Sequence, residues 1–448
     1  MFSSHVFKAI AWACISSWYY GYHLAELNYP ANGLTCHPSP NDGTAPLRPC
    51  LGLDAIKYSA VTALLTAGGL VGSALSDSVV RSQGVPGGIA WTGWLNLVGA
   101  LMMALAPHWG VLALGRFIAG LSCGLAICLV PPYLATVART TPELASRSGQ
   151  IGSLNQLAIV IGICSSQVMG MLLTGPTGDK PGGWRYVLVV SALASIVQIG
   201  MGEHHMTQNY VPHDPDEPRD EAAAPLLPAP GTAAPNDQLS IRAVLSNPSL
   251  RGPALLITTI MVLQQLSGVN AVLFYSTPVL SSVLQGAGAG ALSVGITVVN
   301  ALMTLPAIAL VDKLGRRTLL LASATSMAFM SIMLAVGLDQ NREYLSSFAI
   351  VAFIAAFAIG LGPVPFLLVS DMMPAPAIPA VSSLALSGSW ITNFIVAMGF
   401  IPLRDALSEP ADPNDPGNGA RLGEGRVFYV FTFMLVLMVS VVLRGVHT

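Results

Sequence analysis

Runs of about 20 predominantly apolar residues recur twelve times along this chain, and they constrain its fold more than any other feature. An α-helix of that length crosses the hydrocarbon core of a bilayer, which is about 30 Å thick. Only 9% of the residues are charged, against about 25% in soluble domains, and 53% are hydrophobic. The sequence therefore predicts an all-α integral membrane protein. The predicted spans lie near residues 9–29, 55–77, 87–106, 110–137, 149–173, 184–202, 252–284, 290–311, 318–337, 345–371, 380–402 and 426–444.

The first apolar run follows Lys8 and continues into Tyr19, Tyr20 and Tyr22 with no small-residue cleavage site. It is therefore predicted to be a lasting membrane span and not a signal peptide. An even number of spans places both termini on one side of the membrane. Positive charge is nearly balanced between the two sides and does not decide which side this is. A net charge of −2 without a basic cluster argues against a nucleic-acid partner.

Residues 203–250 form a long polar segment in which prolines alternate with acidic residues, which predicts a largely disordered linker. It separates residues 1–202 from residues 251–448, and each part holds six predicted spans. Within the linker, Glu221 with Leu226-Leu227 loosely matches an acidic dileucine sorting signal, although a featureless linker explains it equally well. The pair His204-His205 lacks further ligands at a recognised spacing, so neither a metal site nor a cofactor is predicted.

Three amides stand close together in the seventh apolar run, at Gln264, Gln265 and Asn270. An amide without a hydrogen-bond partner in hydrocarbon costs several kcal/mol, so these side chains must face protein, water or a ligand. On a straight helix Gln265 and Asn270 point about 140° apart, whereas a break at Ser267-Gly268 turns both toward one cavity. Transporters build midplane sites in this way. The alternative is that the amides only join neighbouring helices.

The stretch Gln264-Gln265-Leu266-Ser267-Gly268-Val269-Asn270 closely resembles the seventh-helix motif of the facilitative glucose transporters, in the major facilitator superfamily. The resemblance extends over nearly the whole chain, through residues 115–121, 152–157, 312–318, 362–365 and 390–394. It implies the major facilitator fold, with twelve helices in two pseudo-symmetric six-helix bundles. It also implies that residues 312–317 and both termini are cytosolic.

The same resemblance implies a sugar-binding site. Sugar hydroxyls are expected to bind amides at Gln156, Gln264, Gln265, Asn270, Asn300 and Asn393, with Trp390 packing on the ring. Phe366 stands where the glucose transporters have a tryptophan, and Ala358 where they have a glutamate, so both changes bear on gating or on the ring-stacking wall. No covalent chemistry is implied, and the chain is not expected to be an enzyme.

In the first span, His23 occupies the place where proton-coupled sugar symporters have an aspartate directly after Gly-Tyr. A buried imidazole that titrates near neutral pH can carry a coupling proton, and Glu26 lies one helical turn on as its candidate partner. The alternative is that His23 only bonds to a neighbouring helix.

The cytosolic charge network that latches the gate in the family is incomplete here, because the arginine pair after the second span and two acidic segments are missing. The remaining members are Arg139, Glu143, Arg147, Asp312, Arg316, Arg317 and Asp371. We therefore predict that the resting protein favours the cytosol-facing state.

Two of the six cysteines, Cys36 and Cys50, share one polar loop on the expected non-cytosolic side. The other four lie within predicted spans, where cysteine behaves as a small apolar residue. Because non-cytosolic compartments are usually oxidising, Cys36 and Cys50 are predicted to form a disulfide.

The function expected from these features is facilitative, alternating-access transport of a hexose or a related sugar or polyol. The carrier is expected to be a monomer in the plasma membrane or in a vacuolar or endosomal membrane. Two alternatives stay open, a proton-coupled sugar symporter that uses His23 and Glu26 and a non-transporting sugar sensor. The sequence contains no nucleotide-binding motif, which argues against an ATP-driven pump.

Overall fold

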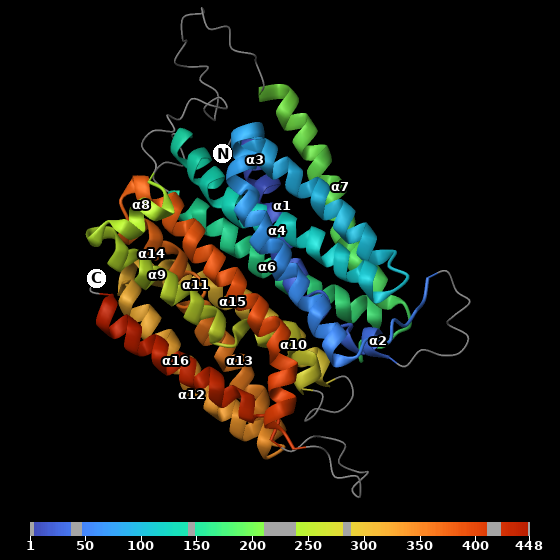
Figure 1. The fold of residues 1–448 in the computed structure, drawn as a ribbon. Coiled ribbons are helices and arrows are strands. Elements are labelled where there is room, and N and C mark those ends of the chain that lie inside the picture. Colours follow the sequence, from blue (N-terminus) through green and yellow to red (C-terminus); the bar gives the residue numbers. More distant parts are fainter. Residues whose placement is uncertain are drawn as a thin grey trace, which may run out of the picture.

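The computed structural model describes residues 4–36, 47–141, 148–209, 239–280, 288–409 and 423–446. Helices up to α7 gather on one side of the molecule and those from α8 onward on the other (Figure 1). We call these the N-terminal and C-terminal groups. The first group comprises α1 (Ser4–Ala25), α2 (Ala31–Thr35), α3 (Ala55–Ala104), α4 (Trp109–Thr140), α6 (Ser148–Thr174) and α7 (Gly183–Asn209). The second comprises α8 (Ile241–Ser246), α9 (Pro248–Leu266), α10 (Val269–Leu280), α11 (Gly288–Leu314), α12 (Arg316–Asp339), α13 (Glu343–Ile359), α14 (Val364–Met372), η4 (Ala375–Ala377), α15 (Ile378–Leu407) and α16 (Arg426–Gly445).

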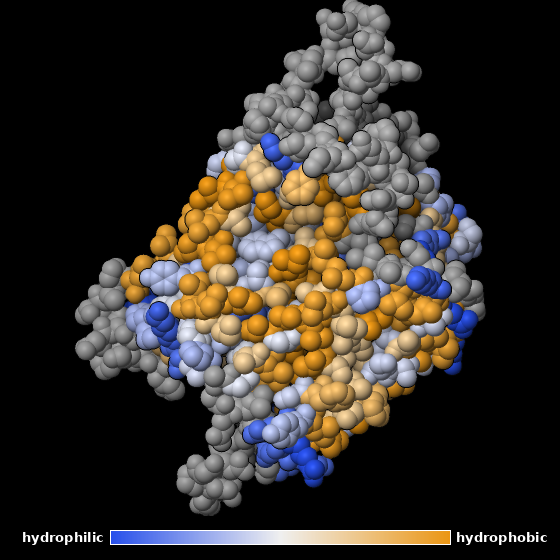
Figure 2. Space-filling model, turned by 180° about the vertical axis from the view of Figure 1, so that it is seen from behind, coloured by the Kyte–Doolittle hydropathy of each residue, from blue (hydrophilic) through white to orange (hydrophobic). Residues whose placement is uncertain are grey.

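Eleven stretches of the described helices are long and apolar enough to cross a membrane, and they coincide with eleven of the twelve predicted spans. The remaining predicted span corresponds to α1, which has 22 residues. It contains three tyrosines, three serines and two histidines, so it does not reach the hydropathy of the other eleven. The long α3 contains two spans, because its chain turns at Gly84 (φ 71°) just before Pro86. Apolar side chains cover the middle of the face seen in Figure 2, as expected for a surface in contact with lipid.

Two spans of the C-terminal group are broken in the middle. Helix α9 ends at Leu266 and α10 begins at Val269, with Gly268 between them at φ 89°. This confirms the predicted break. A side chain at Gly268 would also place its Cβ 2.4 Å from the ring of Phe431. The second break separates α13 from α14 near Gly360.

Close helix pairs in the N-terminal group depend on glycine, as is common where membrane helices pack without a hydrophobic driving force. A Cβ on Gly21 would lie 1.8 Å from the carbonyl oxygen of Ile159, at the crossing of α1 and α6. A Cβ on Gly120 would lie 2.2 Å from the carbonyl oxygen of Leu65, between α4 and α3. The backbones of these pairs are therefore in direct contact.

The two ends of the molecule differ in how the groups meet. We call the end with α2 and α10 the loop end, and the end with α8 and the last residues of α7 the linker end (Figure 1). Near the loop end, buried residues of both groups, such as Leu34, Tyr58 and Tyr275, belong to one continuous core. Toward the linker end, Trp12, Leu129 and other residues of the N-terminal group form a separate core. Within the described residues, the hydrophobic cores of the groups merge at one end only.

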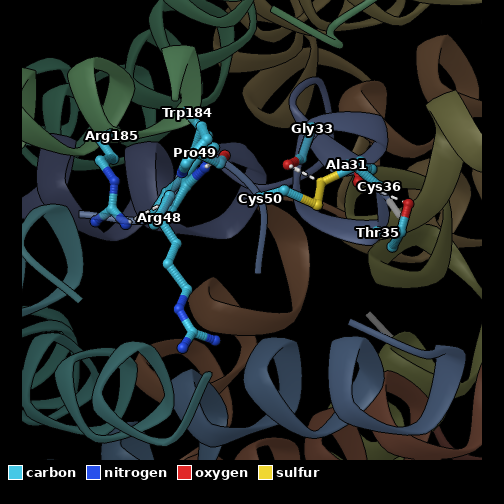
Figure 3. The surroundings of a disulfide bond; sticks show 9 residues. All are labelled: Ala31, Gly33, Thr35, Cys36, Arg48, Pro49, Cys50, Trp184 and Arg185. Atoms are coloured by element: carbon cyan, nitrogen blue, oxygen red, sulfur yellow. Dashed lines mark hydrogen bonds between the residues drawn. A yellow bond between two sulfur atoms is a disulfide. The ribbon is translucent and has the colours of Figure 1, made fainter. Parts of the chain in front are cut away.

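The predicted disulfide is present. Cys36 and Cys50 are joined, with their Cα atoms 5.9 Å apart, and the other four cysteines are free and lie within helices (Figure 3). Two side chains from the start of α7 hold the irregular segment just before Cys50. The indole Nε1 of Trp184 donates to the carbonyl oxygen of Pro49 (3.0 Å), and Arg185 donates to that of Arg48 (2.7 Å).

The segment expected to be a linker is partly helical where it is described. Helix α7 extends to Asn209, and α8 lies at the other end of the segment. The backbone N–H of Leu239 donates to the carbonyl oxygen of Pro376 (3.0 Å), so this end is attached to the C-terminal group. Residues 210–238, which include the candidate sorting signal, lie outside the described residues.

Candidate functional site

The break between α9 and α10 brings Gln265 and Asn270 together. The Asn270 amide nitrogen donates to the side-chain oxygen of Gln265, and the Gln265 amide nitrogen donates to Ser389 Oγ on α15 (2.6 Å). Gln265 is 9% exposed and Asn270 is 7% exposed. The pair is therefore buried but not fully enclosed, and it connects three helices.

Asn393 lies on the same side of α15 as Ser389, because the two residues are four positions apart on one helix. Its side chain is buried, and its Oδ1 accepts no hydrogen bond from the described residues. A buried amide oxygen without a partner costs about 1–3 kcal/mol. It is therefore an unused acceptor one helical turn from Ser389, which bonds to Gln265.

Gln264 points elsewhere. Its amide nitrogen donates to the carbonyl oxygen of Leu361 (2.5 Å), at the break between α13 and α14, while its Oε1 has no described partner. The side chain thus satisfies a backbone group that the helix break leaves free. The sequence grouped Gln264 with Gln265, but the structure gives its donor a role in joining the two broken spans.

The other predicted binding residues are spread over further helices. Asn300 on α11 is buried and Gln156 on α6 is half-buried, and these two helices pack against each other. Within the described part of the chain, the amides of Asn300 and Gln156 form no side-chain hydrogen bond, so both are available to a ligand. Phe366 on α14 is 39% exposed, unlike the buried amides.

Trp390 on α15 extends across to the N-terminal group. Its indole Nε1 donates to Ser73 Oγ on α3 (2.8 Å), and its ring meets that of Tyr20 edge to face, with centroids 5.6 Å apart. The ring also covers Gly69, where a Cβ would lie 2.5 Å from it. Trp390 is only 3% exposed, so this contact is buried between the groups.

A second polar cluster lies inside the N-terminal group. His23 Nδ1 is 2.8 Å from Glu26 Oε1, and its Nε2 is 2.6 Å from Asn96 Oδ1 on α3. Arg116 on α4 donates to the same Glu26 oxygen (2.8 Å) and to the backbone carbonyl of His23 (2.7 Å). Asn96 in turn donates to Ser191 Oγ on α7 (2.9 Å). The cluster therefore links α1, α3, α4 and α7.

The expected pairing of His23 with Glu26 is confirmed, and both residues are fully buried. His23 also bonds to a neighbouring helix through Asn96, as the alternative to proton coupling expects. Sequence analysis did not assign a partner to Arg116. An arginine within an apolar span needs an acidic partner, and this requirement was the signal that could have identified the pair.

A hydrogen-bonded contact between the groups at the loop end was also not anticipated. The Asn28 amide donates to Ser276 Oγ on α10 (2.7 Å) and accepts from the backbone N–H of Thr277 (3.1 Å). Nearby, the ring of Tyr29 lies against Gly290 of α11, where a Cβ would be 2.7 Å from the Tyr29 hydroxyl. These contacts close α1 against α10 and α11.

The candidate gate charges are described only in part. Arg316 on α12 pairs with Asp371 on α14 (2.9 Å), and Arg317 donates to the carbonyl oxygen of Leu443 (3.2 Å). Both contacts join helices of the C-terminal group. Glu143, Arg147 and the side chains of Arg139 and Asp312 lie outside the described residues. In the described part of the chain, no three histidine, cysteine, aspartate or glutamate side chains gather as metal ligands.

Comparison with known proteins gives one consistent result. The family model for "Sugar (and other) transporter" matches residues 9–203 and 214–448. A probable metabolite transport protein of Saccharomyces cerevisiae is 28% identical, covering 89% of this chain and 87% of its own length. The facilitated glucose transporter member 4 of solute carrier family 2 from Mus musculus is 30% identical, covering 89% and 82%. The fold is similar to that of the xylose transporter XylE from E. coli in a partially occluded, inward-open conformation, with a TM-score of 0.73, 19% identity, and coverage of 99% of this chain and 100% of the other.

Proposed function

Because the chain belongs to the family of sugar (and other) transporters and is a sugar carrier of the major facilitator fold, we propose that it moves a hexose or a related sugar or polyol by facilitated alternating access. It is a multi-pass membrane protein, and its relatives are transporters and not enzymes. We further propose that it works as a monomer, with both termini cytosolic, in the plasma membrane or in a vacuolar or endosomal membrane.

One observation carries the proposal, namely the buried amide group at the α9–α10 break. Gln265 and Asn270 are already hydrogen-bonded to each other, and the neighbouring Asn393 Oδ1 lacks a described donor. A sugar hydroxyl both donates and accepts hydrogen bonds. It can therefore donate to that oxygen and accept from the amide nitrogen of Gln265 or Asn270. Gln156, Asn300 and Trp390 complete the proposed binding set, while Gln264 and Phe366 are proposed to act at its edge.

The direct test is transport by the purified protein in liposomes, measured with a panel of radiolabelled hexoses, pentoses and polyols. We expect saturable uptake that runs down the sugar gradient and is unchanged by an imposed pH gradient. Uptake driven uphill by an inward proton gradient would instead support the symporter alternative. Saturable binding with no flux for any sugar would support the sensor alternative.

Replacing Gln265 by leucine is expected to weaken sugar binding about ten- to a hundredfold. The substitution removes a donor and an acceptor and leaves the Asn270 amide without its partner, at a cost of about 1–3 kcal/mol. Equilibrium binding of the labelled sugar to the detergent-solubilised protein measures the change. Gln340→Leu, at the exposed end of α12, is the matched control. Unchanged binding in both Gln265→Leu and Asn270→Ala would show that the site lies elsewhere.

The symporter alternative is supported by the proximity of His23, Glu26 and Arg116. Hydrogen bonds connect these three ionisable side chains inside the N-terminal group, where a coupling proton could be held. The facilitator is preferred because each ring nitrogen of His23 already has a protein partner. A coupling group must exchange its proton with the solvent, and these contacts leave it enclosed within the N-terminal group.

We also propose that the resting protein opens toward the linker end, which is the expected cytosolic side. The merged core and the Asn28–Ser276 bond at the loop end support this. Single cysteines placed along the two cavity mouths are expected to react faster with an impermeant maleimide from the cytosolic side. Introducing arginines at Val85 and Pro86, which restores the family's missing pair, is expected to reduce that preference. Faster labelling from the other side in the unmodified protein would contradict the proposal.

A further inference from the structure

Trp390 connects the two groups of helices at the level of the proposed site. The residue lies next to Ser389, which binds Gln265, and three positions before Asn393. Its ring, however, contacts the other group, where it lies on Gly69 and against Tyr20. The ring that is expected to pack on a sugar is therefore already packed on protein.

Ser73 gives this ring a defined position. Its hydroxyl accepts the indole N–H of Trp390 (2.8 Å) and donates to the backbone carbonyl oxygen of Gly124 on α4 (3.2 Å). Because Ser73 donates its hydroxyl proton to Gly124, a lone pair of the Ser73 oxygen faces the indole. The hydroxyl is thus oriented to accept, and the chain Trp390–Ser73–Gly124 ties α15 to α3 and α4.

Gly69 provides the surface on which the ring rests. It lies one helical turn before Ser73 on α3, so the two residues share a face of that helix. Any side chain at this position would overlap the six-membered ring of the indole, to which an added Cβ would come as close as 2.5 Å. The bare backbone at Gly69 and the oriented hydroxyl of Ser73 together form a docking site for the Trp390 ring.

We infer that Ser73 and Gly69 hold Trp390 in a closed position in the sugar-free protein, and that sugar must draw the indole away from Ser73 before the ring can pack on it. Ser73 is then a positioning residue, which acts on the substrate only through Trp390. The inference rests on the proposed function. It adds that part of the sugar's binding free energy is used to break a contact between the two groups.

Removing the Ser73 hydroxyl should make the closed position less stable while leaving the amides untouched. The net contribution of one hydrogen bond corresponds to about a two- to tenfold change in an equilibrium constant. We therefore expect Ser73→Ala to bind sugar about two- to tenfold more tightly. Turnover should slow, because Trp390 returns less readily to Ser73 in the empty carrier.

The test is ¹⁹F NMR of the full chain labelled with 5-fluorotryptophan in lipid nanodiscs. The chain has seven tryptophans, and the Trp390 resonance is assigned from the spectrum of Trp390→Phe. Without sugar, we expect that resonance alone to move in Ser73→Ala and in Gly69→Ala. It should stay in place in Ser76→Ala, the matched control, whose hydroxyl bonds to the Ser73 carbonyl of its own helix. The six other resonances report whether each variant is folded.

The sugar-free spectra are independent of the proposed function, because they depend only on the contact. An unmoved Trp390 resonance in a folded Ser73→Ala protein would overturn the inference, whatever the protein transports. Adding a transported sugar should shift the wild-type resonance toward its position in Ser73→Ala. If the sugar binds without shifting it, the inference is also overturned while the proposed function stands.

Discussion

Replacing Glu26 by leucine is expected to lower the free energy of unfolding by about 3–5 kcal/mol, the largest effect anticipated for a single substitution in this chain. Glu26 Oε1 accepts from Arg116 and lies 2.8 Å from His23 Nδ1, and the side chains of Glu26 and Arg116 are 0% and 1% exposed. Leucine would leave the guanidinium buried without a counter-charge. Removing one partner of a buried pair costs more than the intact pair contributes.

Denaturant titration of the protein in micelles, followed by tryptophan fluorescence, measures the effect. The double variant Glu26→Leu with Arg116→Leu is the matched control, because it removes both charges and should recover most of the loss. If Glu26→Leu alone unfolds at the wild-type denaturant concentration, the pair has no stabilising role. If the wild type proves to be proton-coupled, coupling that survives in a folded Glu26→Gln variant would show that Glu26 carries no coupling proton.

The second large effect is expected from the disulfide. Replacing Cys36 and Cys50 together by serine should lower the free energy of unfolding by about 3 kcal/mol. In the chain-entropy account, a disulfide that closes a loop of about 15 residues destabilises the unfolded state by that amount. The sequence separation here is 14. Trp184 and Arg185 would still bond to the backbone of Pro49 and Arg48. The loop end should therefore keep its structure but lose stability.

Thermal unfolding with and without reductant measures the loss. The wild type should lose stability on reduction, whereas the double serine variant should be indifferent to the reductant. A Cys14→Ser variant, which changes a free thiol inside α1, controls for cysteine replacement itself. Linked peptides in a non-reduced digest establish the bond in membranes, and equal stability of wild type and double variant would contradict the expected contribution.

Local features of the sequence were enough to predict the spans, the break at Gly268 and the disulfide. A membrane span depends on about 20 consecutive apolar residues, and a break depends on one glycine that can adopt a positive φ. The boundary of α1 was predicted less well, at 9–29 instead of Ser4–Ala25. Its last predicted residues include Asn28 and Tyr29, which lie beyond the helix and contact the other group.

The contacts between the groups could not be predicted from the sequence. Trp390 and Ser73 are 317 positions apart, and Asn28 and Ser276 are 248 apart. Each side chain taken alone is an ordinary polar or aromatic residue. Only the packed arrangement shows that Gln264 bonds to a helix break while Gln265 bonds to Asn270, although the two glutamines are neighbours in the chain.

The inter-group contacts of Asn28, Tyr29 and Trp390 have a consequence for the ionic environment. Each joins neutral groups, an amide to a hydroxyl, a phenol ring to a glycine and an indole to a hydroxyl. Dissolved ions screen attraction between exposed charges over about 10 Å at 0.1 M but leave short, buried hydrogen bonds between neutral groups nearly unchanged. These three contacts should therefore hold the groups together equally well in dilute and concentrated salt. Among the ion pairs of the described residues, salt can weaken exposed ones such as Arg316 with Asp371, which join helices within one group.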